Sequence, residues 1–329
     1  MVTDLKTIIF GLLITFKTGY GQDFGYDGNT GPDFWGLKYQ GCNGGKLQSP
    51  IDIELNNVTE KEFPPLVFQH FDEPLETVKL ENNGHTALLS IKQGKIPNVR
   101  GGPLNETYNF SQLHFHWGRT DDEGSENLVN NQSFPLELHM VLYNTKYGNF
   151  SNALYYDDGL TVLSFLYHKT IKQNQHYQKF ERELPAVENL NATVDIIGFV
   201  SLDNFTTTDR NEYFTYKGSL TTPPCSEVVT WLEFINTIPL SHEQIQEFRF
   251  LSGARGKLNH NFRPAQARND RSVYMNIPTL SSTASSSNDR SSSKLNAHSK
   301  NGRSSSGDLR SNCGVFVLLM FKYFYYIVN

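Results

Sequence analysis

The sequence predicts a mainly β (α+β) fold with only a few short helices. Many short runs of β-branched and aromatic residues are separated by clusters of Gly, Pro, Asn and Asp, which is typical of strands joined by turns. Hydrophobic residues make up 38% of the chain and aromatic residues 13%, which is enough for a large packed core. A length of 329 residues without a visible internal repeat allows one or two domains.

Composition excludes several classes of function. The net charge is -5, so the chain has no cationic excess to attract phosphates, and we expect no nucleic acid as a partner. With only 3 Cys, the chain forms neither a disulfide-dense miniprotein nor a Cys-rich zinc module. Any metal must therefore be held mainly by carboxylates or by some of the 10 His.

The N-terminus, residues 1–21, has the pattern of a secretory signal peptide. Its apolar run, residues 8–16, is too short to span a bilayer, follows Lys6 and precedes a stretch rich in small residues. Asp4 and Lys17 are unusual in such a signal, so a buried N-terminal segment is the alternative interpretation.

Potential glycosylation sites favour the secretory route, although each Asn-x-Ser/Thr triplet alone is common by chance. The seven acceptors are Asn57, Asn105, Asn109, Asn131, Asn149, Asn191 and Asn204. In an oxidising compartment we expect Cys42 to pair with Cys225, because both lie in the folded region whereas Cys313 lies in the tail. The alternative is three free thiols.

The first segment that carries chemistry is residues 111–117, whose period-two alternation predicts a β-strand. Gln112, His114 and His116 fall on one face of this strand, and three large apolar side chains fall on the other. Two imidazoles therefore project side by side into one space. A lone His-x-His on a strand is, however, more often a pair of hydrogen-bonded or exposed histidines than a metal site.

A second segment, residues 136–141, alternates in the same way and supplies a third imidazole, His139, beside the carboxylate of Glu137. Three neutral imidazoles are typical of a catalytic zinc site, because they leave one coordination position for water. A zinc-bound His usually donates its other ring N–H to an acceptor, and Gln112 and Glu137 lie on the correct faces to accept. Two matching strands, each with an acceptor, favour a Zn2+ site.

Helical stretches are few, and turns dominate the connections. Clusters rich in Gly, Pro, Asn and Asp mark turns at residues 82–84, 100–103, 121–124 and 157–159. The best candidate helix is residues 241–250, which begin with Ser241 as the N-cap and have Glu243 and Gln244 in the first turn.

The C-terminal part divides into a predicted disordered linker, residues 277–311, and a hydrophobic tail, residues 312–329. From residue 281 on, the linker is rich in Ser and lacks aromatic residues, Ile and Val, so it has little to bury. Small residues at 304–307, a polar spacer and a terminal apolar run match a glycolipid (GPI) attachment signal. A short retained membrane helix, which would fall below the roughly 20 residues of a span, and an amphipathic end folded onto the domain are the alternatives.

Across residues 24–276 the chain resembles an α-class carbonic anhydrase of the extracellular, membrane-associated type. The resemblance rests on specific motifs in a specific order. These are Gly31-Pro32 and Trp35, Gln48-Ser49-Pro50-Ile51, Asn82-Asn83-Gly84-His85, Gly101-Gly102-Pro103-Leu104, His114-Phe115-His116-Trp117, Gly124-Ser125-Glu126, Glu137-Leu138-His139, Tyr216 with Gly218-Ser219-Leu220-Thr221-Thr222-Pro223-Pro224-Cys225, and Arg263-Pro264-Ala265-Gln266.

This resemblance implies a single domain around a twisted, largely antiparallel ten-stranded sheet with short peripheral helices. Zinc would lie at the base of a conical cleft, with His114, His116 and His139 as its ligands. Cys42 and Cys225 match the disulfide of the secreted members.

The resemblance also assigns catalytic roles. Thr221 would orient a zinc-bound hydroxide that attacks carbon dioxide, and Glu126 would in turn orient Thr221. His85 would shuttle the proton to buffer, with Tyr26 and Asn83 ordering the water chain. Carbon dioxide would rest against a wall that matches Val141, Val162, Leu220, Thr222 and Trp231.

The function implied is zinc-dependent, reversible hydration of carbon dioxide to bicarbonate and a proton at the extracellular face of the plasma membrane. The chain would be held there by its tail or a lipid anchor; single-pass and secreted forms are the alternatives. A catalytically silent binding or matrix protein of the same fold is the alternative function. Inactive members typically lack a zinc His, whereas all three are present here.

Two positions depart from the family pattern. Asn127 stands where animal members usually have a His that supports the region of Glu137, which weakens the expectation of a rigid hydrogen-bond network there. Phe24 replaces a common Trp near the N-terminus, and we expect only a packing change.

Overall fold

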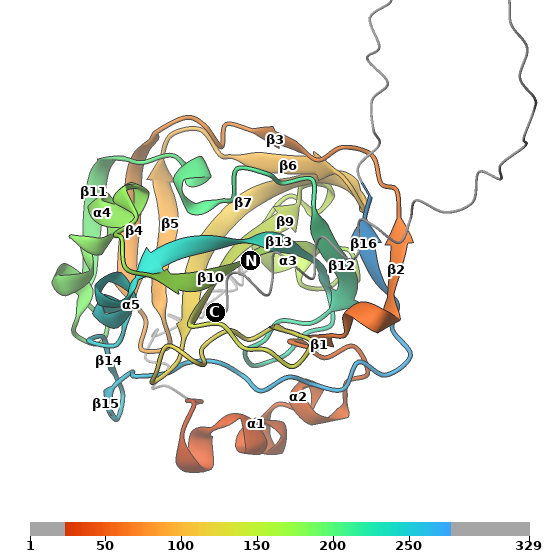
Figure 1. Ribbon diagram of the computed structural model, residues 1–329, viewed down its shortest axis with the longest axis horizontal. Coiled ribbons are helices and arrows are strands. Elements are labelled where there is room, and N and C mark those ends of the chain that lie inside the picture. The colour runs from red at the N-terminus through yellow and green to blue at the C-terminus, as the bar shows by residue number, and fades with distance from the viewer. Residues whose placement is uncertain (1–23, 278–329) are drawn as a thin grey trace, which may run out of the picture. The chain divides into compact units, whose positions relative to one another are not determined.

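The computed structural model describes residues 24–277, which fold around one large mixed sheet (Figure 1). The strands are β1 Asp52–Ile53, β2 Val58–Lys61, β3 Val67–Gln69, β4 Leu75–Asn82, β5 Ala87–Gln93, β6 Asn98–Gly101, β7 Leu104–Trp117, β8 Leu128–Val129, β9 Leu136–Asn144, β10 Leu160–Thr170, β11 Thr193–Phe199, β12 Tyr213–Gly218, β13 Val229–Ser241, β14 Ser252–Gly253, β15 Gly256–Lys257 and β16 Val273–Asn276. The α-helices are α1 Pro32–Lys38, α2 Gly41–Gly44, α3 Phe150–Ala153, α4 Gln178–Glu181 and α5 His242–Phe248. Short 3-10 helices are η1 Gly28–Thr30, η2 Leu55–Asn57, η3 Thr145–Tyr147, η4 Gln175–Tyr177, η5 Leu184–Val187 and η6 Leu202–Phe205.

The predicted mainly β fold is confirmed, with twelve strands in the large sheet rather than ten. Ten of them form one path in the order β11-β4-β5-β7-β9-β10-β13-β12-β16-β2. The two additional strands are β3 and β6, and β6 pairs with the first half of β7 while β5 pairs with its second half. The 14-residue β7 is long enough to hold two neighbours on one edge. Within this sheet β10–β13 and β16–β2 are parallel and the other pairs are antiparallel.

Alternating side chains bury both faces of the central strands. Leu113, Phe115 and Trp117 of β7 belong to the larger core, as predicted. Helices α4 and α5 pack on that face through Phe180 and Phe248, whose rings lie 5.1 Å and 4.8 Å from the ring of Phe115. The opposite face carries the histidines and a second, smaller core.

The predicted helix at 241–250 is confirmed at its start and is two residues shorter at its end. Ser241 caps α5, and Ser241 and Gln244 form a reciprocal capping box. The helix ends at Phe248 because the amides of Arg249 and Phe250 bond three residues back, in the tighter 3-10 pattern.

The N-terminal elements η1, α1 and α2 lie below the sheet in the view of Figure 1. The predicted disulfide is confirmed: it joins Cys42 of α2 to Cys225, with 5.0 Å between the two Cα atoms. The buried guanidinium of Arg263 donates to the carbonyl oxygens of Cys42 and Ser49 and to the side chain of Gln48. The disulfide therefore fastens the N-terminal arm to the loop after β12, and Arg263 fastens it to the segment between β15 and β16.

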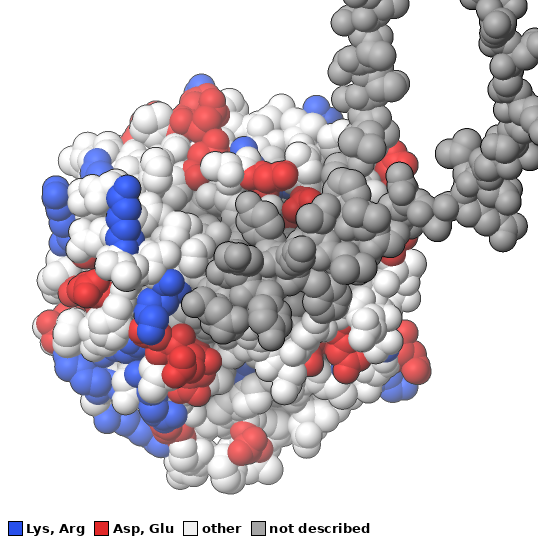
Figure 2. Space-filling view, in the orientation of Figure 1, with Lys and Arg blue, Asp and Glu red and all other residues white. Residues whose placement is uncertain are grey.

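The described surface carries charges of both signs. Figure 2 shows acidic and basic side chains lying among one another, and exposed pairs include Lys257–Glu188 and Lys92–Asp195. Five predicted glycosylation acceptors are exposed and two, Asn109 and Asn204, are half-buried. Within residues 24–277 no helix is both long and apolar enough to cross a membrane. The predicted signal peptide, the linker beyond Ile277 and the C-terminal tail lie outside the described residues.

Candidate metal centre

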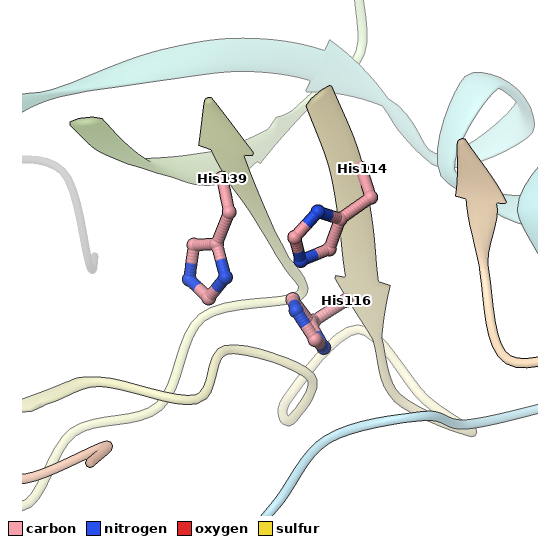
Figure 3. Close-up of side chains that lie close together, drawn as sticks. All are labelled: His114, His116 and His139. Carbon is pink, nitrogen blue, oxygen red and sulfur yellow. The ribbon is translucent and has the colours of Figure 1, made fainter. Parts of the chain in front are cut away.

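The register between β7 and β9 brings the three predicted histidines together. His114 lies opposite His139 in the antiparallel pair, and His116 lies opposite Glu137. All three imidazoles therefore point from one face of the sheet, and one ring nitrogen of each lies within 4.8 Å of the others. Figure 3 shows the rings turned toward one another.

Hydrogen bonds decide which nitrogen each histidine leaves free. His114 Nδ1 donates to Gln112 Oε1 at 2.8 Å, and His139 Nε2 donates to Glu137 Oε1 at 2.7 Å, as the sequence predicted. His116 Nδ1 donates to the carbonyl oxygen of Asn261 at 2.8 Å. This third partner comes from a loop remote in sequence and was not predicted. The free atoms are Nε2 of His114, Nε2 of His116 and Nδ1 of His139.

The chemistry of this set fits a metal ion. Burial, together with the neighbouring histidines, lowers the pKa of His114 well below its usual range and that of His116 to about 3, so both rings are neutral at pH 7. Among the described residues, His116 Nε2 is buried without a hydrogen-bond partner. A lone pair held in this way is costly unless a ligand meets it. Three imidazoles with one open position are the donor set of a catalytic zinc site.

Glu137 is held firmly in place behind His139. It accepts five hydrogen bonds, from the amides of Glu126 and Asn127, the Asn127 side chain, the Ser164 hydroxyl and His139. Burial alone would raise the pKa of Glu137, but His139 and the hydrogen bonds lower it below its usual range. Asn127 therefore supports Glu137 directly through two donors, its backbone amide and its side-chain Nδ2. Glu137 is held in place although Asn stands where the family usually has a His.

Glu126 and Thr221 lie beside the ligands. The Glu126 carboxylate is hydrogen-bonded to the side chain of Thr221 and accepts from the amide of Arg263 at 2.8 Å. Its Oε2 atom lies 3.3 Å from His116 Nε2. Thr221 is thus tied to an oriented carboxylate at the edge of the cluster.

An apolar surface borders the cluster on the same face. Val141, Val162 and Trp231 lie opposite one another on adjacent strands β9, β10 and β13, and each is almost fully buried. The Trp231 ring lies 4.8 Å from that of His139. Leu220 packs partly buried against this group, and Thr222 is half-buried beside it in sequence.

His85 lies under the N-terminal arm rather than free at the surface. Its ring stacks on Phe24 with 3.9 Å between the centroids and an interplanar angle of 5°, and Tyr26 lies edge-on at 6.5 Å. Burial lowers the pKa of His85 to about 4. The Asn83 side chain accepts from the amides of His85 and Thr86, so it shapes this turn. Phe24, expected to matter only for packing, is therefore the direct contact of His85.

Comparison with known proteins gives one consistent result. Residues 30–277 match the family model of the eukaryotic-type carbonic anhydrase. Carbonic anhydrase 15 of Mus musculus is 34% identical over 260 residues, which cover 75% of this chain and 80% of that protein. Mitochondrial carbonic anhydrase 5B of Homo sapiens is 35% identical over 238 residues, covering 70% and 74%. Carbonic anhydrase 1 of Oryctolagus cuniculus is 35% identical over 237 residues, covering 70% and 98%.

Proposed function

The chain belongs to the eukaryotic-type carbonic anhydrase family, a zinc-dependent family, and from this premise we propose that it catalyses the reversible hydration of carbon dioxide to bicarbonate and a proton. The observation that carries the proposal is the convergence of three imidazoles beside a buried apolar surface. The first holds the metal, and the second suits a small apolar substrate.

The residues divide the work. When bound, zinc lowers the pKa of a water molecule to about 7 and so supplies a nucleophile at neutral pH. His114, His116 and His139 would hold it. Thr221, fixed by Glu126, would accept a hydrogen bond from the nucleophile and so orient it. Val141, Val162, Leu220 and Trp231 would give carbon dioxide an apolar resting place, with Thr222 at its margin.

Proton release is assigned to His85, with Tyr26 and Asn83 ordering water near it. In the stacked position its pKa of about 4 is too low for efficient relay near pH 7. We therefore place the relay in a second position of the ring, turned away from Phe24 into water, where the pKa returns toward 6.5.

A stopped-flow hydration assay on the purified, zinc-loaded protein tests the activity. We expect rapid hydration that a sulfonamide abolishes, and the same loss after His139→Ala. Zinc-loaded protein that binds the sulfonamide but does not accelerate hydration would instead support a silent binding or matrix protein.

We also propose that the enzyme works at the extracellular face of the plasma membrane, with residues 1–21 removed as a signal and the tail exchanged for a glycolipid anchor. The disulfide and the exposed glycosylation acceptors support the secretory route. Phosphatidylinositol-specific phospholipase C should release activity from intact expressing cells. Activity that stays on the cells, with a tag after Asn329 still present, would favour a spanning tail.

A further inference from the structure

A buried carboxyl group behind the metal centre has no role in the proposed reaction. Glu233 lies on β13, two residues beyond Trp231 and on the same face, and its exposed fraction is 0%. A charged carboxylate in such a position is strongly destabilising unless it becomes neutral or is paired and hydrogen-bonded. Its presence in a strand of otherwise apolar inward-facing residues calls for a specific function.

Strand register places Glu233 in one row with the metal ligands. His114 of β7 lies opposite His139 of β9, His139 lies opposite Ser164 of β10, and Ser164 lies opposite Glu233 of β13. Directly opposed side chains on one face of a sheet are within reach of one another. In this row, only Ser164 stands between the ligand His139 and Glu233.

The Asn127 side chain joins Glu233 to Glu137. Asn127 Nδ2 donates to Glu233 Oε2 at 3.1 Å and to Glu137 Oε1 at 2.9 Å. The Ser164 hydroxyl, which lies opposite Glu233 on the neighbouring strand, donates to Glu137 Oε1 at 2.7 Å. Both groups touch the one oxygen that accepts the N–H of His139.

The two oxygens of Glu233 differ in their surroundings. Glu233 Oε2 accepts from Asn127, whereas Glu233 Oε1 is, among the described residues, buried without a hydrogen-bond partner. Burial of such an oxygen is less costly on a neutral carboxylic acid than on a carboxylate, so we assign Glu233 as neutral. Burial and the negative charge of Glu137 both raise the pKa of Glu233 well above its usual range, which agrees with this assignment.

The Asn127 amide cannot rotate without loss. Its Nδ2 donates to the two carboxyl groups, while its Oδ1 accepts from the Tyr216 hydroxyl at 2.7 Å and from the Ile51 amide at 3.3 Å. All four hydrogen-bonding positions are used. Glu233 supplies the only one of these contacts that comes from β13.

We propose that Glu233 is a positioning residue of the zinc centre: it holds the Asn127 amide, and through it the Glu137 oxygen that orients His139. The role is to slow the loss of zinc by fixing a ligand ring, because partners of metal-bound histidines typically change metal affinity about 10- to 100-fold. This inference rests on the proposed zinc site.

The test is the rate of zinc release from the purified holoprotein into excess dipicolinate. Glu233→Leu should release zinc about 10- to 100-fold faster than the wild type. Glu233→Gln keeps the contact with Asn127, since its side-chain oxygen still accepts from Asn127 Nδ2, and should stay close to the wild-type rate. Glu233→Asp has a side chain one methylene shorter, so it should also release zinc faster than the wild type. This variant replaces Glu233→Leu in the test if the leucine variant does not fold.

Leu232→Ala is the matched control. Leu232 is the neighbour of Glu233 on β13 but faces the larger core on the other side of the sheet. It should lower the thermal midpoint without changing zinc release. Wild-type release from Glu233→Leu or Glu233→Asp, or fast release from Glu233→Gln, would overturn the inference. A wild-type protein that holds no zinc at all would overturn the proposed function instead.

Discussion

At the scale of single residues, the three histidines are fixed by three different kinds of acceptor: an amide, a carboxylate and a backbone carbonyl. Only the free nitrogens face one another, so each ring is committed before the metal arrives. Because the three rings are already oriented, the loss of any one of them removes a preformed metal ligand.

His116→Ala should therefore reduce zinc binding by orders of magnitude, because one of three protein ligands is removed. Metal content after dialysis against a weak chelator is the measurement. His176→Ala, which removes an exposed histidine, is the control and should keep one zinc per chain. Stoichiometric zinc in the His116 variant would refute the assignment of ligands.

The stacked position of His85 predicts a pH dependence of stability. Its pKa of about 4 in the folded state is below the value of about 6.5 expected when unfolded, so between these values the unfolded chain binds more protons. Stability at this site is therefore lost as the pH falls from about 6.5 to 4 and is not lost further below 4. His85→Gln should remove up to about 3 kcal/mol of the loss between pH 7 and pH 4, as measured by urea unfolding.

Phe24→Ala should raise the pKa of His85 toward 6.5, because the ring regains contact with water. Titration of the imidazole C–H resonances by NMR gives the value directly. Phe34→Ala, which removes a partly exposed ring from α1, should leave it unchanged. A wild-type His85 that already titrates near 6.5 would show that the ring spends most of its time away from Phe24.

At the scale of elements, local patterns were predictable and partners from distant segments were not. Period-two alternation gave the correct faces for His114, His116 and His139, because face depends only on neighbours in the chain. Asn261, Ser164 and Glu233 reach the site through loops and strand register, which depend on pairing between remote segments. For Glu233, the one indication in the sequence was a charged residue within the mostly apolar segment 229–234.

Ser241→Ala tests the helix that was predicted from its cap. The change removes the side-chain acceptor for the Gln244 amide, so we expect a loss of about 1 kcal/mol in the free energy of unfolding with an unchanged m value. Ser151→Ala in α3 alters an exposed serine that is not a cap and should have little effect when both variants are made without glycosylation, because Ser151 also completes the Asn149 acceptor. Equal effects of the two changes would remove the capping box as a source of stability.

At the scale of the whole domain, the disulfide closes a loop between residues 183 positions apart. On chain-entropy grounds its removal by Cys42→Ser with Cys225→Ser should cost on the order of 4 to 5 kcal/mol. Urea unfolding under oxidising conditions measures the loss, and the wild type unfolded with reductant should show the same midpoint as the double variant. An unchanged midpoint would mean that Arg263 and the surrounding contacts hold the arm without it.

The parallel pair β2–β16 also determines when the large sheet can be completed during biosynthesis. Val58 pairs with Val273, so β2 has no strand beside it in the sheet until roughly two hundred further residues have been made. At roughly 5 to 20 residues per second, the ribosome needs roughly 10 to 40 seconds to supply the partner. During that interval the nascent chain exposes a strand edge, and the charged residues of β2, Glu60 and Lys61, are of the kind that discourage pairing with another chain. The large sheet can therefore be completed only after β16, the last of its strands in the sequence, has been synthesised.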